Sequence, residues 1–321
     1  MSEIKNLIFS FLGVFVLALF LFPFFIGWQE KNHIGQKIKK EGPNLHLYKE
    51  NTPSMGGMII VLSGLLVLSL FQKFTPQMWI ILITLLSFGG LGLLDDYFKC
   101  FRGEPWSLKA RHKFLLQLVL AVFILAIAFP LFPHHLAISR GGRVIELGSI
   151  PFFLYSLFLI LASANAFNIA DGLDGLSAGC GILTFSFWMV VFLLQGDYSL
   201  AQVAAVFSGA LLSFLWFNFW PTRIFMGDCG SLSLGALMGV LALFSGHSWL
   251  LALVGIVYVL DTLSVILQVF SFQVFGRRIF LMSPLHHHFE LRGEKESKIT
   301  VRFWIIQAVG VAVAFLSMVM G

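Results

Sequence analysis

Ten long apolar runs constrain this chain more than any other feature of its sequence. A bilayer core about 30 Å thick takes about 20 apolar residues of α-helix, and 58% of the 321 residues are hydrophobic while only 12% are charged. The runs cover residues 4–27, 56–71, 76–94, 114–132, 150–167, 176–194, 199–219, 230–245, 248–272 and 301–320. We therefore predict an all-α polytopic membrane protein with about ten transmembrane helices, forming a single integral membrane domain over residues 1–321.

The assignment of four of these runs as membrane helices needs an argument. Run 56–71 is short, and only Gly246 and His247 separate the eighth run from the ninth. Run 4–27 is too long for the core of a typical signal peptide, no small-residue cleavage site follows it, and a basic stretch does. We predict that it is a retained first helix.

The basic residues predict the orientation of the helices. Lys and Arg collect on the cytoplasmic side of a membrane because their translocation is unfavourable. Loops 28–55, 98–113, 220–229 and 273–302 hold all but four of the 21 Lys and Arg residues. This predicts that these loops face the cytoplasm and that both termini are periplasmic. The net charge of +5 is thus mainly a topology signal, so we expect the lipid bilayer and phosphorylated ligands, not nucleic acid, as partners.

One loop on the other side has a pattern of its own. Residues 133–149 alternate in polarity around Gly141 and Gly142. This pattern fits a small external β-hairpin or an irregular loop equally well.

Six aspartates lie within or at the ends of the apolar runs, where a charge is costly unless it is paired. They are Asp95, Asp96, Asp171, Asp174, Asp228 and Asp261. The first five fall where their runs meet the predicted cytoplasmic loops, and only Asp261 is placed deeper. This layout predicts a site that opens to the cytosol and has one edge in the bilayer.

Asp95 and Asp96 end the third run, and Lys99 follows about one helical turn later. Adjacent carboxylates repel each other unless a cation lies between them. The pair therefore predicts an Mg²⁺-binding or proton-transfer element. The alternative is a solvated helix end with an i,i+4 pair to Lys99.

Asn165, Asn168, Asp171 and Asp174 recur at every third residue. Steps of three rotate by about 300°, so on one straight helix the four would spread over about half of the circumference. The glycines that follow each aspartate predict a break that turns the last carboxylate back toward the first ones. Oxygen ligands without a nearby Cys favour Mg²⁺. A glycine-rich loop with helix caps is the alternative.

The segment 225–235 is predicted to begin the eighth helix after Asp228. Asp228 can cap that helix, and Ser231 with the free N–H groups behind it could bind phosphate. Capping alone is the alternative role.

Three consecutive histidines, His286, His287 and His288, follow Ser283 and Pro284. With Ser283 as N-cap and Pro284 at the first helical position, the triplet would begin a helix. Neighbouring helical residues point about 100° apart, so the three cannot all touch one ligand. We predict that one or two contact phosphate or substrate, while a transition-metal site and a purely structural role are the alternatives.

A proton- or cation-coupled transporter is the rival class, because pumps also use aspartates within the membrane. A transporter site is expected near the middle of the bilayer, together with an internal repeat. The acidic residues here gather at one face instead, and no repeat is apparent.

Five motifs together resemble those of the phospho-N-acetylmuramoyl-pentapeptide transferase family, which belongs to the polyprenyl-phosphate sugar-1-phosphate transferases. They are TPSMGG (52–57), DDYFK (95–99), NAFNIADGLDGL (165–176), FMGDCGSLSLG (225–235) and SPLHHHFE (283–290). They occur in that family's order and extend from the first cytoplasmic loop to the last.

The resemblance implies a fold and an activity. A member of this family would be a ten-helix enzyme of the bacterial cytoplasmic membrane, commonly a homodimer. It would transfer phospho-MurNAc-pentapeptide from UDP-MurNAc-pentapeptide to undecaprenyl phosphate in peptidoglycan synthesis. The reaction would depend on Mg²⁺ and would give lipid I and UMP.

The resemblance also implies roles for individual residues. Asp228 would be the principal Mg²⁺ ligand, assisted by Asp95 and Asp171, and Asp95 would deprotonate the lipid phosphate or act as nucleophile. The implied catalytic residues are Asp95, Asp96, Asp228 and His286. The implied substrate-binding residues are Lys49, Ser54, Lys99, Lys113, Asn165, Asn168, Asp171, Asp174, Asn218, Phe225, His287 and His288. Phe225 would stack on uracil, and the histidine loop would hold the sugar or the diphosphate.

Three positions depart from the family pattern. Ser54 and Cys229 stand where Thr is usual, and Asp261 stands where Glu is common. These departures concern local hydrogen bonds more than the chemistry, and Asp261 is expected to make a hydrogen bond between packed helices.

Overall fold

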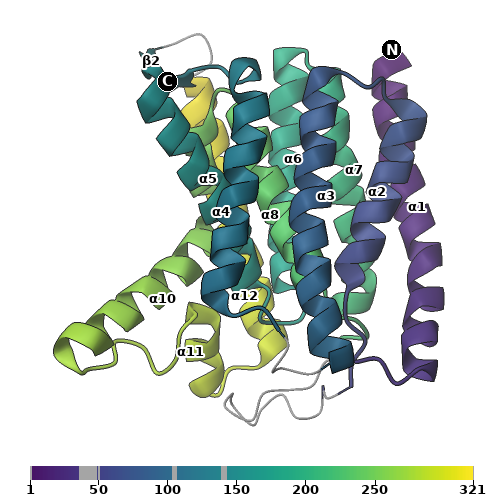
Figure 1. Ribbon diagram of the computed structural model, residues 1–321, viewed down its shortest axis with the longest axis vertical. Helices are drawn as coiled ribbons and strands as arrows, with labels where there is room; N and C mark the ends of the chain where they lie inside the picture. The colour runs from purple at the N-terminus through teal and green to yellow at the C-terminus, as the bar shows by residue number, and fades with distance from the viewer. Residues whose placement is uncertain (1, 36–48, 50, 103–106, 139–142, 321) are drawn as a thin grey trace.

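Long helices, most of them nearly parallel to one another, build almost the whole structure (Figure 1). The computed structural model describes residues 2–35, 49, 51–102, 107–138 and 143–320. The long helices are α1 (Ser2–Lys31), α2 (Gly56–Phe71), α3 (Pro76–Tyr97), α4 (Ala110–Ala128), α5 (Ser149–Ala170), α6 (Leu176–Gln195), α7 (Tyr198–Asn218), α8 (Gly227–Phe244), α10 (Ile256–Phe275) and α12 (Glu296–Met320). The short helices are the π-helix η2 (Phe98–Arg102), the 3₁₀ helices η4 (Phe129–Leu131) and η5 (Ser248–Leu250), α9 (Leu251–Val254) and α11 (Leu285–Leu291).

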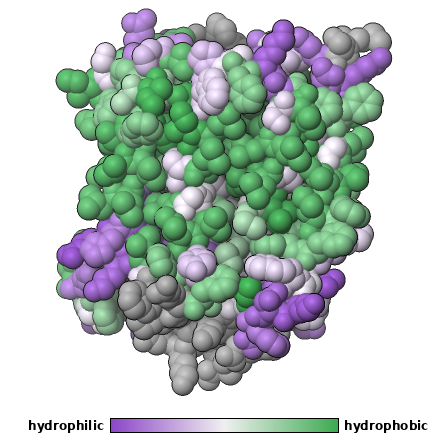
Figure 2. All heavy atoms as spheres, turned by 45° about the vertical axis from the view of Figure 1, so that its right-hand side comes forward, coloured by the Kyte–Doolittle hydropathy of each residue, from purple (hydrophilic) through white to green (hydrophobic). Residues whose placement is uncertain are grey.

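The lengths of the helices match a membrane. Among the described residues, nine helices are long and apolar enough to cross a bilayer, and the 16-residue α2 is a shorter apolar helix. Apolar side chains form a broad band across the face shown in Figure 2, with hydrophilic side chains toward its two ends. The prediction of an all-α polytopic protein with about ten membrane helices is confirmed.

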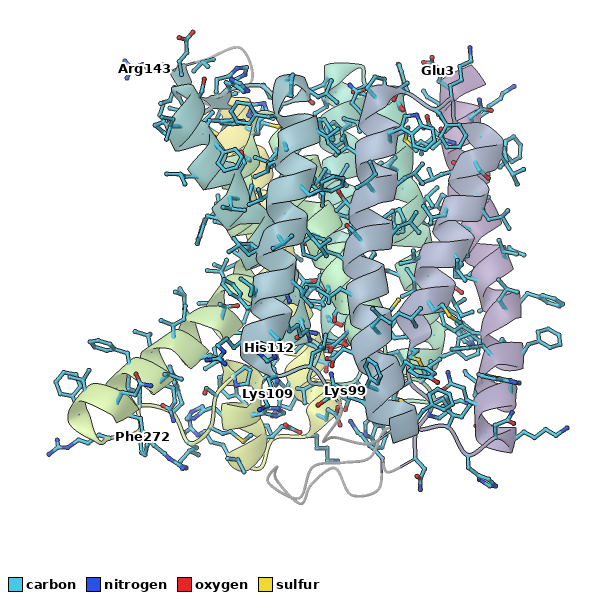
Figure 3. The ribbon with its side chains drawn as sticks, viewed as in Figure 1. Glu3, Lys99, Lys109, His112, Arg143 and Phe272 are labelled. Carbon is cyan, nitrogen blue, oxygen red and sulfur yellow. The ribbon has the colours of Figure 1, made fainter. Side chains whose placement is uncertain are left out.

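The predicted ninth run, 248–272, is not one helix. It begins as η5 and α9, and the chain bends at Gly255 before α10 starts at Ile256. The backbone of Gly255 lies at φ −112° and ψ 25°, outside the α-helical region, so the axis changes direction there. As a result α10 projects away from the bundle, with Phe272 near its far end (Figures 1 and 3).

Residues 133–149 contain a hairpin. Strand β1 (His135–Ala137) pairs antiparallel with β2 (Val144–Glu146), with His135 opposite Glu146. The structure therefore decides for the hairpin; residues 139–142, between the two strands, lie outside the described residues, as do the lysines of 36–48.

Helix α8 lies at the centre of the bundle and packs against α2, α3 and α5. Glycines allow this close approach, because a Cβ at Gly57 would lie 2.1 Å from the backbone of Gly230. A Cβ at Gly92 would lie 2.2 Å from the carbonyl oxygen of Asp228. Small residues of this kind let membrane helices pack backbone to backbone. The end of α3 is thereby pressed against the beginning of α8.

We expect Gly92→Ala to destabilise the protein by about 1–3 kcal/mol, because the added methyl group would overlap the backbone of α8. Gly90 is the matched control, since it lies in the same helix and nothing lies within 4 Å of its Cβ position. Replacing Gly90 with Ala should leave stability unchanged or raise it by up to about 1 kcal/mol. Thermal unfolding of the purified protein in detergent measures both variants. Equal melting temperatures for the two would contradict the packing described.

Candidate active site

A buried carboxylate at the start of α8 gathers three side chains from other helices. Lys99 of η2 and Lys113 of α4 each place Nζ 2.6 Å from Oδ2 of Asp228, and Asn168 of α5 donates to Oδ1 at 2.7 Å. Lys99 also lies 2.8 Å from Oδ2 of Asp95. We call these five residues the acid–lysine cluster. It lies at the end of the bundle where Lys99 is labelled, opposite Glu3 and Arg143 (Figure 3).

Asp95 is held on both of its oxygens. Its Oδ1 accepts the main-chain N–H of Leu108 at 2.8 Å, while Lys99 contacts its Oδ2. The i,i+4 pair between Asp95 and Lys99, which belonged to the alternative interpretation, is present. The pair is not a solvated helix end, because Asp95 is only 1% exposed and Asp96 only 4%. Lys99 belongs to a π-helical turn, a distortion that is frequent at functional sites.

Asp96 accepts hydrogen bonds from the backbone at the start of α8. Its Oδ1 accepts the N–H of Asp228 at 3.0 Å, and its Oδ2 accepts the N–H of Cys229 at 2.9 Å. The predictions that Asp228 caps this helix and leaves free N–H groups for phosphate are wrong. The physical reason is that a carboxylate from α3 already occupies these donors, and Ser231 is engaged with Asn168 and with the carbonyl of Gly227.

The helix is interrupted between α5 and α6, as the glycines predicted. Residues 171–175, which we call the Asp171–Gly175 turn, connect the two helices. Asp174 does not turn back toward the acid–lysine cluster, because its side chain accepts hydrogen bonds from Lys49 and from the N–H of Thr222.

Asp171 accepts a hydrogen bond from the Ser177 hydroxyl. Burial raises the pKa of the Asp171 carboxyl to about 8; the hydrogen bond from Ser177 opposes this shift, and the negative charges of Asp228 and Asp96 add to it. Asp171 therefore lies close enough to Asp228 of the acid–lysine cluster for that charge to affect its pKa.

A second group of charges lies beside the same turn. Lys49 places Nζ 2.6 Å from Oδ1 of Asp174 and 2.6 Å from Oε1 of Glu296, and Glu296 also accepts the N–H of Asp174 at 2.7 Å. We call these three buried residues the Lys49 triad. Burial raises the pKa of Asp174 to about 6, and the charge of Lys49 opposes that shift. Burial lowers the pKa of Lys49, but the two carboxylates more than offset this and raise it above its usual value.

Helix α12 supplies residues that the sequence did not single out. Besides Glu296, Thr300 donates to the carbonyl of Asp174 at 3.1 Å, and Trp304 donates to the carbonyl of Gly175 at 3.2 Å. These residues are four apart, so they form one face of an apolar helix. The spacing of four was visible in the sequence and could have indicated that these residues form one face of the helix. In the structure this face holds the Asp171–Gly175 turn.

Two of the predicted substrate-binding asparagines are engaged within the protein. Asn218 accepts the N–H of Gly175 at 3.0 Å and donates to the carbonyl of Ile224 at 2.9 Å. Asn165 donates to Oε1 of Gln117 at 2.6 Å, which ties α5 to α4. In the structure both position backbone or neighbouring helices.

Ser54 and Phe225 lie on two segments that run side by side. The main chain of Ser54 exchanges hydrogen bonds of 2.7 and 2.8 Å with the side chain of Gln29. The N–H of Phe225 donates to the carbonyl of Pro53 at 2.8 Å, and its carbonyl accepts the N–H of Gly56 at 2.9 Å. Phe225 is half-buried and lies just before α8.

The three histidines point in different directions, as helical geometry predicted. His286, His287 and His288 each place Nδ1 near a different partner. These partners are Oδ2 of Asp261 at 2.8 Å, Oε2 of Glu290 at 2.6 Å and the N–H of Leu281 at 3.2 Å, in that order. Glu290, like Glu296, is an acid that the sequence did not single out.

The start of the histidine helix differs from the prediction. Helix α11 begins at Leu285, with Pro284 at the N-cap position and no side-chain cap. Pro284 has an extended ψ of 171°, so helical geometry begins only after it. The prediction of Ser283 as N-cap and Pro284 as first helical residue is therefore wrong.

The cluster carries the chemistry of a hard-cation site, but the predicted ligands do not converge. Asp95 and Asp228 contact the ammonium groups of Lys99 and Lys113, and the carboxyl groups of Asp96 and Asp171 lie close to Asp228. No three acidic, His or Cys side chains form a metal-binding group within the described part of the chain. The predicted triplet of Asp95, Asp171 and Asp228 is not assembled, because lysines bridge the first and third and Ser177 holds the second. Carboxylate oxygens nevertheless suit Mg²⁺, which commonly takes one or two carboxylates and completes its shell with water and phosphate.

This fold and site define a class: a multi-pass helical membrane protein with a buried carboxylate–lysine site at one end, suited to polyanionic substrates. Residues 78–246 match the family described as glycosyl transferase family 4. The chain is 37% identical to a phospho-N-acetylmuramoyl-pentapeptide-transferase of Caldanaerobacter subterraneus, over 98% of this chain and 99% of the relative. It is 40% identical to the enzymes of that name from Lactobacillus gasseri and a Wolbachia species, over 94% and 93% of this chain and 95% of each relative. The chain therefore belongs to glycosyl transferase family 4 and, within it, to the phospho-N-acetylmuramoyl-pentapeptide-transferases.

We expect Asp96→Asn to destabilise the protein by about 1–3 kcal/mol. An amide has only one acceptor oxygen, so one N–H at the start of α8 would face another donor. Asp197→Asn is the control, because Asp197 caps α7 through a single accepted hydrogen bond, which Asn makes equally well. Thermal unfolding in detergent should separate the two variants. Similar small losses for both would argue against the role given to Asp96.

We expect Glu296→Gln to weaken the Lys49 triad and to lower stability by about 1–3 kcal/mol, because a buried ammonium group loses one of its two carboxylates. The matched control is Glu294→Gln. Glu294 pairs with Arg302 and Lys298, which are both more than half exposed, so its loss should change stability by less than about 1 kcal/mol. Urea unfolding in a fixed detergent gives the free energy of unfolding of both variants. An equal loss in the two would contradict the contribution of the Lys49 triad to stability.

Proposed function

We propose that the chain transfers phospho-MurNAc-pentapeptide from UDP-MurNAc-pentapeptide to undecaprenyl phosphate, giving lipid I and UMP for peptidoglycan synthesis. It is a transferase of the bacterial cytoplasmic membrane, as its relatives and its apolar helices indicate. The names of the relatives support the reaction. The observation that carries it is the acid–lysine cluster, where one carboxylate holds two ammonium groups at one end of a membrane bundle.

We propose that the end of the bundle with the acid–lysine cluster faces the cytoplasm and that both termini are periplasmic. The two termini lie at the same end of the bundle, and Lys99, Lys109 and His112 lie at the other (Figures 1 and 3). The basic loops identified from the sequence connect helices at the second end. The positive-inside rule then supports a cytoplasmic site, where a water-soluble nucleotide sugar and a lipid phosphate can meet.

The proposed reaction is one phosphoryl transfer. A non-bridging oxygen of undecaprenyl phosphate attacks the sugar-bearing phosphorus of the diphosphate, and a new P–O bond forms. The bond from that phosphorus to the bridging oxygen breaks, and UMP leaves with its electron pair. Lys99 and Lys113 lie where they can offset the negative charge that develops on the phosphoryl oxygens.

Asp95 is proposed to act as a proton acceptor in direct transfer. Both of its oxygens contact donors, the N–H of Leu108 and the ammonium group of Lys99. Asp95 can accept a proton on a remaining lone pair while it keeps these contacts and holds Lys99 in place, whereas attack on phosphorus would require it to move out of them. This favours a single displacement over a phosphoryl-enzyme intermediate.

We propose that the reaction depends on Mg²⁺ held chiefly by Asp228, with Asp171 and Asp95 nearby. The oxygen donors gathered around Asp228 support this assignment, because Mg²⁺ prefers oxygen ligands. When bound, Mg²⁺ would neutralise the diphosphate and make its phosphorus more electrophilic. Asn168 would hold Asp228 in position through its hydrogen bond to Oδ1.

The nucleotide and sugar are proposed to bind on either side of the Asp171–Gly175 turn. The Lys49 triad and the half-buried Phe225 are the candidate uridine contacts, with Phe225 stacking on uracil. His286 and His287, on α11, are the candidate sugar or diphosphate contacts. A homodimer is also proposed, and light scattering of the purified protein tests it.

UMP release is the measurement that tests the function. Purified protein in detergent receives UDP-MurNAc-pentapeptide, undecaprenyl phosphate and Mg²⁺. We expect steady UMP release that stops with EDTA and resumes with excess Mg²⁺. Asp228→Asn should lower the rate by about 100-fold or more, because a ligand and a lysine partner are lost.

Asp197→Asn is the control variant, since Asp197 lies in the connection between α6 and α7, at the other end of the bundle from the Asp171–Gly175 turn. UDP-GlcNAc in place of the muramoyl substrate should give no UMP. UMP release that persists in EDTA would refute the proposed dependence on Mg²⁺. A folded sample that releases no UMP would refute the transferase assignment.

A further inference from the structure

Asp261 and His286 form a buried pair that lies apart from the acid–lysine cluster and the Lys49 triad. Asp261 lies in α10 and His286 in α11, and both are 0% exposed. Oδ1 of Asp261 lies 3.3 Å from the main-chain nitrogen of His286, and Oδ2 lies 2.8 Å from its ring nitrogen Nδ1. One carboxylate therefore holds both the backbone and the ring of the histidine.

This contact determines where the ring proton lies. A carboxylate can only accept hydrogen bonds, so Nδ1 of His286 must be the donor. In a neutral imidazole the other nitrogen, Nε2, then carries a lone pair and no proton. Asp261 thus selects one tautomer of His286.

The second nitrogen of His286 lacks a partner inside the protein. Nε2 is buried and makes no hydrogen bond with any of the described residues. It points at the Asp171–Gly175 turn, because a Cβ at Gly172 would lie 2.4 Å from it. Gly172 itself is exposed, and the residue before it is Asp171. The nitrogen therefore lies directly behind an exposed glycine at the edge of the site.

Anchoring α11 to α10 would not account for this arrangement. The hydrogen bond from the main chain would anchor the helix without a histidine, and a buried polar atom without a partner lowers stability and calls for an explanation. A Cβ at Gly172 would overlap Nε2, so only a glycine at this position lets the turn lie against the ring. The buried nitrogen without a partner, at the edge of the site, points to a ligand that supplies that partner.

We propose that Asp261 is a positioning residue that keeps the proton of His286 on Nδ1, so that Nε2 accepts a hydrogen bond from an O–H group of the bound nucleotide sugar at the Asp171–Gly175 turn. This inference rests on the proposed function for the identity of the ligand. The tautomer itself does not depend on that function.

The tautomer is measured by NMR on the full chain in detergent with ¹⁵N-labelled histidine rings. The signals of His286 are those lost in His286→Gln. We expect protonated Nδ1 and unprotonated Nε2 in the wild type, and a change of the Nε2 signal when UDP-MurNAc-pentapeptide is added. A wild-type ring with the proton on Nε2 would overturn the proposal.

Asp261→Asn should move the proton. The main-chain N–H of His286 is a fixed donor, so the amide oxygen must face it and the amide NH₂ must face Nδ1. Nδ1 then becomes an acceptor, and the proton moves to Nε2, as happens when the triad aspartate of a serine protease is replaced by asparagine. Asp197→Asn is the matched control and should leave the histidine signals unchanged. An unchanged tautomer in Asp261→Asn would overturn the proposal.

Activity provides the second arm. We expect Asp261→Asn to lower kcat/KM for UMP release by about 10- to 100-fold at an unchanged melting temperature, and Asp261→Glu, which keeps a carboxylate, to recover most of it. Full activity in Asp261→Asn, or a Glu variant as impaired as the Asn variant but equally folded, would contradict the positioning role. If Asp261→Asn does not fold, the tautomer of the wild type and the activity of Asp261→Glu still test the positioning role. Absence of UMP release from the wild type would instead refute the proposed function and leave the tautomer result standing.

Discussion

Mutual compensation of buried charges is the constraint on which the rest of this structure depends. Carboxylates within a membrane bundle are tolerated only when cations or hydrogen-bond donors satisfy them. Here two lysines bridge Asp95 and Asp228, two main-chain N–H groups satisfy Asp96, and Lys49 joins Asp174 to Glu296. Apart from Lys99, which follows Asp95 by one helical turn, each partner comes from a different helix or loop, so most of these charges can be satisfied only when the bundle is assembled.

The Asp171–Gly175 turn is where the separate parts of the site meet. The negative charge of Asp228 raises the pKa of Asp171 in this turn, Asp174 belongs to the Lys49 triad, and Gly172 lies against the ring of His286. Helix α12 holds the turn from one side and Asn218 from another. The break between α5 and α6 therefore brings the acid–lysine cluster, the Lys49 triad and His286 to one place.

The sequence predicted the site's residues better than their contacts. Periodicity and charge located every aspartate of the site, and helical geometry showed that three successive histidines could not share one ligand. The cap of α8 was predicted wrongly, because Asp228 is local in sequence and Asp96 is not. Glu296 and Glu290 were missed, since an acid in a polar segment carries no signal until its partner is known. The break at Gly255 was missed because a single glycine within an apolar run does not by itself end a helix.

What the sequence by itself determined is the membrane class, the approximate number of helices and the set of polar residues that the bilayer would not tolerate unpaired. These follow from hydropathy and local spacing, which act over about 20 residues at a time. Only the tertiary structure decided which charges pair, that Asp96 rather than Asp228 caps α8, and that Asp261 belongs to His286. Such pairings join residues 25 to more than 130 positions apart, and the packing of glycine-lined helices, which no local pattern encodes, sets the distances between them.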